Sequence, residues 1–359
     1  FSSVDIQKII DECIKNQNTV GIVVGLLDQG KMEFYSSGKM GKNNETSVDE
    51  NTLFEIGSIS KVITAIIYED MIVRGEIQRD DPIENYLSLG RSFQYKGKKI
   101  LLDHLLTHTA GFPYMPPGFV GSDPADLFKN CSEEQLIHYL KNVKLTREPG
   151  KKYEYSNIGM SILGYILSKK AGMPFEELMQ KRVCRHLKMD NTVVEVPDAL
   201  KHKFAKGHVH GEEVDNWNTS LFAAAGGVRS TAKDLLHFLA AQMKFFPSLL
   251  DRAFEKSTEG FLPTENEDIY IAHNWHIYTT HSPYIFAHSG ITGGYHAFLA
   301  FRPDLNKGVI ILSNSITDIQ GIEMHILDQR YELKKDHEGI ILTPMVLDRY
   351  VGSYRHASG

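Results

Sequence analysis

The sequence of 359 residues contains no apolar run long enough to cross a membrane as a helix. Its longest apolar stretch near the start, residues 21–27, has the length of a β-strand, whereas a spanning helix needs about 20 apolar residues. No signal peptide is recognisable, and because the chain begins at Phe1 rather than at methionine, the compartment stays open. The sequence therefore gives no sign of a membrane-spanning segment.

Positive charge is not in excess either. Lys and Arg number 39 against 45 Asp and Glu, so the net charge at pH 7 is −6. No basic run is interleaved with aromatic residues, which is the pattern of a surface that binds nucleic acid. Nucleic acid is therefore not an expected partner.

Cysteine is scarce, with Cys13, Cys131 and Cys184 far apart in the chain. Three is an odd number, and the spacings are not those of a metal site, so we expect buried thiols rather than a disulfide framework. The hydrophobic fraction of 42% and the charged fraction of 23% are those of an ordinary globular protein. One large domain or two intertwined ones would fit this length.

Strand patterns lie at the two ends of the chain and helix patterns lie between them. Residues 4–16 have apolar residues at helical spacing, and residues 20–27 and 31–36 read as a β-hairpin. Beyond residue 268 we expect strands at 269–278, 284–288, 295–302 and 309–314, and then a helix over about 318–333.

This order of elements predicts an α+β fold, an α/β sandwich with an antiparallel sheet flanked by terminal helices and a separate all-helical lobe. The predicted sandwich lobe combines residues 1–66 with 268–335, and the helical lobe spans 67–267. Residues 336–359 form a tail without a clear place in either lobe. A cleft between two such lobes is a favoured place for a site.

Ser58 and Lys61 stand three residues apart at the start of an apolar helical pattern. Residues three apart share one face of a helix, so the Lys61 amine is expected close to the Ser58 hydroxyl. A serine needs a base to become a nucleophile, and a buried lysine can lose its proton and serve as that base. The pair is chemically sufficient for acyl transfer.

The same spacing has a structural interpretation as well. Ser-x-x-Lys also occurs at Ser36…Lys39, in a polar turn, and at Ser230…Lys233, where the serine caps a helix. For Ser58 alone, the alternative is an N-cap serine with a lysine that extends toward solvent.

Two further stretches carry groups suited to acyl transfer. Tyr155 and Asn157 lie at a loop-to-helix junction, where a phenol beside an ammonium can shift toward phenolate and an amide can hold a substrate carbonyl. His288-Ser289-Gly290 ends a predicted strand, and the Ile291 N–H there could join the Ser58 N–H as an oxyanion hole. The structural alternatives are a core tyrosine with a capping asparagine and a glycine-rich hairpin with an exposed histidine.

Together, Ser58-x-x-Lys61, Tyr155-x-Asn157 and His288-Ser289-Gly290 resemble the three motifs of the superfamily of class C β-lactamases and serine DD-peptidases. That superfamily also contains esterases, amidases and D-amino-acid peptidases. Residues 101–111 and 226–231 look like its structural signatures, and the resemblance covers about residues 5–333. Within the tail at 336–359, residues 347–354 look like the opening strand of the small C-terminal β-barrel that some members carry.

The resemblance implies a β-lactamase/transpeptidase-like fold and an acyl-enzyme mechanism without a cofactor or metal. Ser58 would attack a carbonyl while Lys61 and Tyr155 share its proton. Asn157, His288, Ser289, Gly290 and Ile291 would bind the substrate or its oxyanion. Two groups of histidines could be considered as metal ligands, namely His104 with His108, and His202 with His208 and His210. Neither group has the glutamate of a His-Glu-x-x-His pattern, so a metal site is not expected.

The substrate is less clearly indicated. Many β-lactamases have lysine where this chain has His288, and no Lys or Arg lies between Lys256 and Arg302. We expect cleavage of an amide bond in a D-amino-acid peptide or a β-lactam, with carboxylesterase activity as the alternative. A non-catalytic penicillin-binding or scaffold protein is the alternative from another class. The resemblance also implies a periplasmic or secreted location and a small-molecule or short-peptide substrate.

Overall fold

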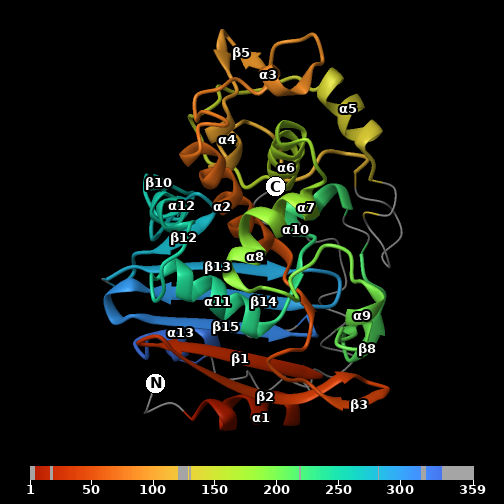
Figure 1. Ribbon diagram of the computed structural model, residues 1–359, viewed down its shortest axis with the longest axis vertical. Helices are drawn as coiled ribbons and strands as arrows, with labels where there is room; N and C mark the ends of the chain where they lie inside the picture. The colour runs from red at the N-terminus through yellow and green to blue at the C-terminus, as the bar shows by residue number, and fades with distance from the viewer. Residues whose placement is uncertain are drawn as a thin grey trace, which may run out of the picture.

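One antiparallel sheet, built from both ends of the chain, forms the base of the molecule (Figure 1). The computed structural model describes residues 5–16, 19–119, 128, 131–217, 220–281, 283–316 and 321–333. Among them, nine strands pair in the order β10-β11-β12-β13-β14-β15-β1-β2-β3. Their bounds are β1 (Gly21–Asp28), β2 (Lys31–Gly41), β3 (Asn44–Ser47), β10 (Leu262–Pro263), β11 (Ile269–Ala272), β12 (Trp275–Tyr278), β13 (Ile285–Ile291), β14 (His296–Arg302) and β15 (Lys307–Ser313). The predicted α+β fold is confirmed.

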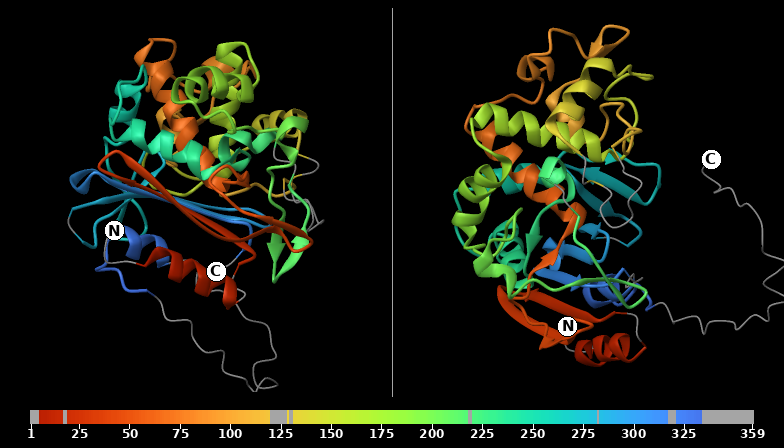
Figure 2. Two further views of the ribbon diagram at one scale, coloured as in Figure 1. Left: turned by 60° about the horizontal axis from the view of Figure 1, so that its bottom comes forward. Right: turned by 90° about the vertical axis from the view of Figure 1, so that its right-hand side faces the viewer.

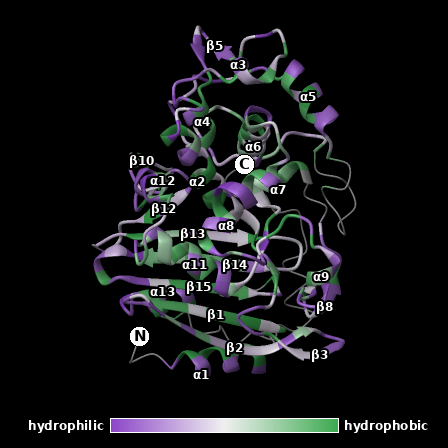
Figure 3. Ribbon diagram, viewed as in Figure 1, coloured by the Kyte–Doolittle hydropathy of each residue, from purple (hydrophilic) through white to green (hydrophobic). Residues whose placement is uncertain are grey.

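Strand β1 pairs with β15 and β2 and is buried on both faces. Val23 and Leu27 belong to the core under the helices, whereas Ile22, Val24 and Leu26 belong to a smaller core on the opposite face. Side chains alternate between the faces of a strand, so a strand covered on both sides needs an uninterrupted apolar run. Figure 3 shows this contrast between the hydrophobic β1 and the hydrophilic, peripheral β3.

Helices cover both faces of the sheet (Figure 2). On the side of the smaller core lie α1 (Ile6–Lys15) and α13 (Ile322–Leu327), the latter shorter than the helix predicted over 318–333. On the other side, α11 (Ala232–Gln242) packs on β1 and β15. Its Leu236 lies so close to β1 that a Cβ at Gly25 would be 3.1 Å from the Leu236 side chain.

Most of the remaining helices form a lobe beyond this face, at the top of Figure 1. The remaining α-helices of the described residues are α2 (Ser60–Val73), α3 (Glu84–Leu87), α4 (Leu102–Leu106), α5 (Glu133–Asn142), α6 (Asn157–Ala171), α7 (Phe175–Met179), α8 (Arg185–Leu187), α9 (Asp198–Lys201), α10 (Ala223–Gly226) and α12 (Asp251–Ser257). Of these, α9 lies outside the lobe, beside β8 and level with the sheet (Figure 1). Short strand pairs are β4 (Phe54–Glu55) with β9 (Arg229–Ser230), β5 (Gln94–Tyr95) with β6 (Lys98–Lys99), and β7 (Gly207–Val209) with β8 (Glu212–Val214). The predicted domain boundaries stay a prediction.

Two sequence predictions meet a limit or a correction in the fold. The tail predicted at 336–359 lies outside the described residues. Between the predicted hairpin and Ser58, where no strand was predicted, lies β3, which pairs with β2 through an irregular register. Within the described part of the chain, no helix has both the length and the apolar character that a membrane crossing requires.

The single strand predicted over 269–278 is in fact a hairpin, β11 and β12, that turns at His273 and Asn274. These two residues have φ values of +42° and +71°, the left-handed pair that a two-residue hairpin turn needs. Asparagine is common at such positions, but histidine followed by asparagine is a weak sequence signal for a turn. The strand-like pattern of residues 269–278 therefore predicted one strand and no turn.

The Asn274 side chain is fully buried between the sheet and the helical lobe. Its amide nitrogen donates to Leu106 O at 3.1 Å, and its Oδ1 lies 2.8 Å from His108 Nε2. The hairpin turn thereby fixes the end of α4 against the sheet.

We predict that Asn274→Ala lowers the free energy of unfolding by about 3 kcal/mol, because it leaves buried polar groups on Leu106 and His108 without partners. The measurement is urea denaturation. Asn306→Ala is the matched control, since Asn306 also has a left-handed φ of +52° but is exposed. Equal losses in the two variants would show that the backbone conformation, and not the buried hydrogen bonds, explains the effect.

Candidate active site

Ser58 and Lys61 meet where the chain passes from β4 into α2. Residues Gly57–Ile59 form a short 3₁₀ turn that continues into α2 at Ser60. Ser58 thus precedes the helix in which the sequence placed it, yet Lys61 Nζ lies 2.9 Å from Ser58 Oγ. The predicted pairing of the two side chains is present in the structure.

The Lys61 side chain is fully buried, with 0% of its surface exposed. Its Nζ also donates to the Ala225 carbonyl oxygen of α10, and no carboxylate of the described residues acts on its pKa. Burial without a counter-charge lowers the pKa of Lys61 well below its ordinary value. This shift favours the neutral form of the amine, and a neutral amine at this position can accept the proton of the serine hydroxyl.

Tyr155 lies on the other side of this amine, with Lys61 Nζ 4.8 Å from the centroid of its ring. The residue after it, Ser156, caps α6 by accepting a hydrogen bond from Gly159 N at 2.9 Å. Burial raises the pKa of Tyr155, and a hydrogen bond with Ser58 offsets only part of this effect. The phenol therefore keeps its proton and is a donor, which differs from the phenolate considered from the sequence.

Asn157 begins α6 and lines a cavity of about 60 Å³ beside Ser58. Its backbone N–H donates to Tyr114 O at 2.9 Å, which joins the start of α6 to another residue of the cavity wall. The other walls of the cavity are mainly aromatic and apolar, with Tyr114, Met115, Phe128, Trp217 and Phe222 among them. The sequence analysis missed this aromatic wall because its members are scattered over more than a hundred positions.

The end of β13 lies in backbone contact with the turn that carries Ser58. A Cβ on Gly290 would be 2.0 Å from Ile56 O and 2.9 Å from Ser58 N. Gly57 has a φ of +48°, and a Cβ there would be 2.8 Å from Ile291 N. Only glycine fits at these two positions, and their contact brings the backbone amides of Ser58 and Ile291 together.

The amide of Ile291 is not used by the neighbouring strand. Thr292 N donates to Tyr295 O at 3.1 Å, so these two residues form a hydrogen-bonded pair. Hydrogen-bonded and non-hydrogen-bonded pairs alternate along an antiparallel ladder, so Ile291 and His296 form a non-hydrogen-bonded pair. The Ile291 N–H points away from β14 and can donate to an oxyanion beside Ser58.

His288 and Ser289 lie on opposite faces of β13. His288 is 2% exposed, and its ring lies 6.3 Å from that of Tyr155, centroid to centroid. Ser289 lines a different cavity, of about 320 Å³, together with Tyr278 and Glu323. The structure therefore brings His288, Gly290 and Ile291 to the Ser58 region, and it places the Ser289 side chain on the other side of the sheet.

Two histidines near Tyr155 were not predicted as site residues. The His108 ring is 4.6 Å from the Tyr155 ring, and its Nδ1 accepts from Ser156 N at 3.1 Å. The His276 ring is 4.9 Å from that of His288. Burial lowers the pKa of His108 to about 3 and that of His276 to about 4, so both rings are neutral near pH 7. The face of β12 that carries His276 could be assigned only after the turn at His273 was known.

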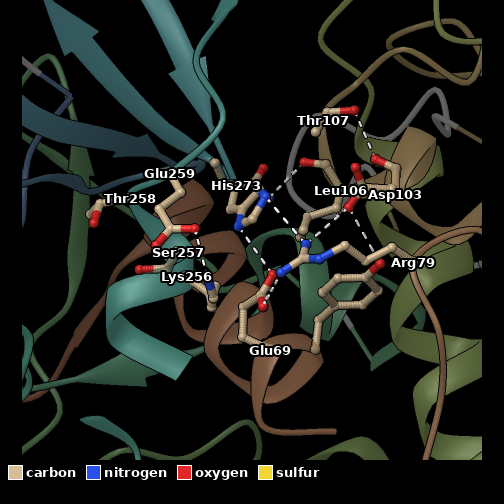
Figure 4. Close-up of polar contacts among 12 residues, drawn as sticks. Glu69, Arg79, Asp103, Leu106, Thr107, Lys256, Ser257, Thr258, Glu259 and His273 are labelled. Atoms are coloured by element: carbon tan, nitrogen blue, oxygen red, sulfur yellow. Dashed lines mark hydrogen bonds and ion pairs between the residues drawn. The ribbon is translucent and has the colours of Figure 1, made fainter. Parts of the chain in front are cut away.

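A buried ionic cluster holds α2 further along the helix (Figure 4). Glu69 of α2 is fully buried, and its carboxylate lies 2.5 Å from Arg79 Nη2 and 3.0 Å from His273 Nδ1. Arg79 also pairs with Asp103 of α4 at 3.2 Å. The helix that carries Lys61 is thereby tied to α4 and to the β11–β12 turn.

Three of the histidines considered as metal ligands, His104, His108 and His208, make structural hydrogen bonds. His104 Nδ1 accepts from Leu101 N at 3.1 Å, and His208 lies between Lys42 N and Asn314 O. In the described ranges, no group of three or more His, Cys, Asp or Glu side chains is arranged to hold a metal ion.

Comparisons with known proteins agree with this geometry. The family described as Beta-lactamase matches residues 6–322. A β-lactamase of Escherichia coli K12 is 28% identical over 344 residues, covering 86% of this chain and 88% of its own. A β-lactamase of Pseudomonas fluorescens is 26% identical and covers 86% of this chain and 94% of its own.

Solved structures give the same result. The structure described as a β-lactamase/D-alanine carboxypeptidase of Pseudomonas syringae has a TM-score of 0.79 at 26% identity, covering 91% of this chain and 98% of its own. A D-alanine carboxypeptidase of Burkholderia cenocepacia has a TM-score of 0.75 at 27% identity, covering 88% and 94%. A class C β-lactamase of Rhodobacter sphaeroides has a TM-score of 0.76 at 25% identity, covering 86% and 93%.

We predict that Gly290→Ala separates β13 from the Ser58 turn, because its Cβ would meet the Ile56 carbonyl. The rate at which a serine-reactive phosphonate labels the protein should fall about 100-fold, the loss typical of one oxyanion donor. Gly41→Ala is the control, since a Cβ there would meet side-chain atoms only, the nearest being Glu213 Oε1 at 3.1 Å, and no backbone atom within 4 Å is among its three nearest contacts. Unchanged labelling of a folded Gly290→Ala protein would contradict the proposed close contact.

Proposed function

The chain belongs to the Beta-lactamase family and is a serine hydrolase of the β-lactamase/D-alanine carboxypeptidase type, and we propose that Ser58 is its nucleophile. The observation that carries this proposal is the 2.9 Å distance between Ser58 Oγ and Nζ of the fully buried Lys61. A neutral amine at hydrogen-bond distance is the base that a serine hydroxyl requires.

In the proposed mechanism, Lys61 Nζ takes the proton of Ser58 as Oγ bonds to the substrate carbonyl carbon. The N–H groups of Ser58 and Ile291 stabilise the oxyanion. Tyr155 gives its proton to the leaving group as the carbonyl–leaving-group bond breaks, and it recovers a proton from Lys61. Water then attacks the acyl carbonyl carbon, and its proton passes through the same groups to Ser58 Oγ as the bond between Oγ and the acyl group breaks.

Asn157 and His288 are proposed to contact the substrate or to shape its site, because Asn157 lines the cavity at Ser58 and His288 lies beside Tyr155. The substrate is a small molecule or a short peptide with an amide or ester carbonyl. Two of the similar solved proteins are described as D-alanine carboxypeptidases, which supports an amide of a D-amino acid as one candidate. A location outside the cytoplasm stays a prediction.

We predict that Ser58→Ala abolishes turnover and covalent labelling. The test is the intact-protein mass after exposure to a serine-reactive phosphonate and, separately, to a simple penicillin, with the free drug assayed for ring opening. A lasting penicillin adduct on the native protein would indicate a peptidase-like site, and a short-lived adduct with ring opening a β-lactamase. Phosphonate labelling of the Ser58→Ala protein at the native rate would refute the assignment.

Tyr155→Phe should lower kcat about 1,000-fold, since it removes the proton donor for the leaving group. The buried ring that packs on His108 is retained in this variant, so the melting temperature should change little. Substrates with leaving groups that need no proton, such as p-nitrophenolate, should lose less. An equal loss for good and poor leaving groups would mean that Tyr155 acts only through packing.

The pH profile of phosphonate labelling should show the ionisation of Lys61. Burial lowers the pKa of this amine, so the neutral base is present above the lowered pKa and the labelling rate falls as the pH drops through it. His108 and His276, with pKa values of about 3 and 4, do not contribute between pH 6 and pH 9. A rate that rises only as the pH approaches about 10.4, the value of an ordinary lysine, would be inconsistent with this mechanism.

A further inference from the structure

The cavity beside Ser58 has a wall that is apolar and held in place. Phe128 contacts Trp217 and Phe222, with ring centroids 5.1 and 5.0 Å apart. The Trp217 carbonyl accepts from Arg229 Nη2 at 3.0 Å, and the same guanidinium pairs with Glu55 at 2.9 Å. Ring contacts and this buried ion pair therefore fix the wall before a substrate arrives.

The Trp217 indole also packs against the β13–β14 turn. A Cβ on Gly293 would lie 2.6 Å from the indole Nε1, so the absence of a side chain there allows the ring to approach the backbone. That turn follows Ile291 directly, so the aromatic wall adjoins the amide proposed for the oxyanion hole. An acyl group bound to Ser58 would lie against Trp217 and its neighbours.

The residues that the structure describes around the cavity offer no free cation for a substrate carboxylate. None of its lining residues within the described part of the chain is Lys or Arg. Lys61 is buried and directed at Ser58 and Ala225. Arg229 is directed at Glu55 and at the carbonyls of Val194, Gly227 and Trp217.

Next to Tyr155, on the leaving-group side, the described aromatic neighbours supply no lysine or arginine either. The rings that surround Tyr155 are those of Tyr114, His108, His276 and His288. His288 Nδ1 lies 2.6 Å from Ser289 O, so it is the protonated nitrogen, and the buried Nε2 has no hydrogen-bond partner in the described structure. Since a neutral imidazole then presents a lone pair, an anion placed against it gains nothing and loses its hydration.

Charging His288 would be costly. Burial is the main cause that lowers its pKa well below the ordinary value, and the neighbouring His276, Lys61 and His108 lower it further. The backbone carbonyl of Ser289 acts in the opposite direction but does not compensate. The ring therefore does not replace the missing cation near pH 7.

Resting on the proposed function of Ser58, we propose that the preferred substrate is an uncharged ester or amide with an aromatic or branched apolar acyl group and no carboxylate next to the scissile bond. The Ser58 Oγ–acyl bond forms as the bond to the neutral alcohol or amine breaks, and the Ser58 proton leaves with that group. Water then restores Ser58 and releases the carboxylic acid. The apolar acyl group gains affinity from Trp217 and its neighbours, and the uncharged leaving group avoids desolvation of an anion.

The test uses two matched pairs of substrates. Phenylacetyl-glycyl-lactate and phenylacetyl-glycyl-lactamide differ only in a carboxylate against a carboxamide, and the p-nitrophenyl esters of phenylacetate and acetate differ only in the acyl group. We expect kcat/KM to be at least about 10-fold higher for the lactamide and for the phenylacetate. A ratio below 10 in either pair overturns the proposal.

Variants of this chain then assign the cause. Trp217→Ala should remove the advantage of phenylacetate over acetate, with acetate as the internal control. His288→Lys should reverse the order of lactate and lactamide, whereas His288→Gln, which stays neutral, should keep it. If circular dichroism shows that the buried lysine unfolds the protein, the lactamide-to-lactate ratios of kcat/KM for the native protein and for His288→Gln test the proposal instead.

Failure of this proposal and failure of the proposed function are distinguishable. A protein that the phosphonate labels at Ser58 but that prefers the lactate contradicts only the substrate class. A protein that hydrolyses none of the four compounds and is not labelled at Ser58 contradicts the nucleophile itself.

Discussion

The burial of one amine, that of Lys61, is the constraint on which the rest of this molecule depends. A lysine with no exposed surface and no carboxylate beside it costs stability while it is charged, so folding favours its neutral form. A neutral amine can act as a base only where a proton donor lies beside it. Ser58 precedes Lys61 by one helical turn, and its Oγ lies 2.9 Å from Lys61 Nζ. The apolar character of α2, the carbonyl of Ala225 and the ring of Tyr155 maintain this environment.

Holding such a helix in place requires contacts at both ends. At its start, the backbone of Gly57 meets that of Gly290 with no room for a side chain, so the sheet itself positions the Ser58 turn against the end of β13. Further along, Glu69 ties α2 to Arg79 and to His273 in the β11–β12 turn. The neighbouring Asn274 holds His108, which packs on Tyr155. The two sides of the site are thereby connected through one buried hairpin turn.

The sequence predicted the pairing of Ser58 with Lys61 and the overall fold because local spacing and apolar periodicity carry that information. It did not predict the division of residues 269–278 into two strands. Apolar and aromatic residues lie on both sides of His273 and Asn274, and these two residues are not a strong turn signal, so the segment looks like one strand. It also grouped Ser289 with His288, although neighbours in a strand face opposite sides of the sheet. The aromatic wall of Trp217 and Phe222 and the ring of His276 depend on tertiary contacts, for which no local pattern exists.

The most direct test of this account is the ionisation state of Lys61 in the resting protein, measured by NMR of selectively ¹³Cε-labelled lysine, with Lys61→Met to assign the resonance. The account predicts one lysine whose chemical shift at pH 7 is that of a neutral amine and that titrates well below the other lysines. A Lys61 resonance that titrates with the exposed lysines near pH 10.4 would contradict it, because a charged amine could not take the proton of Ser58.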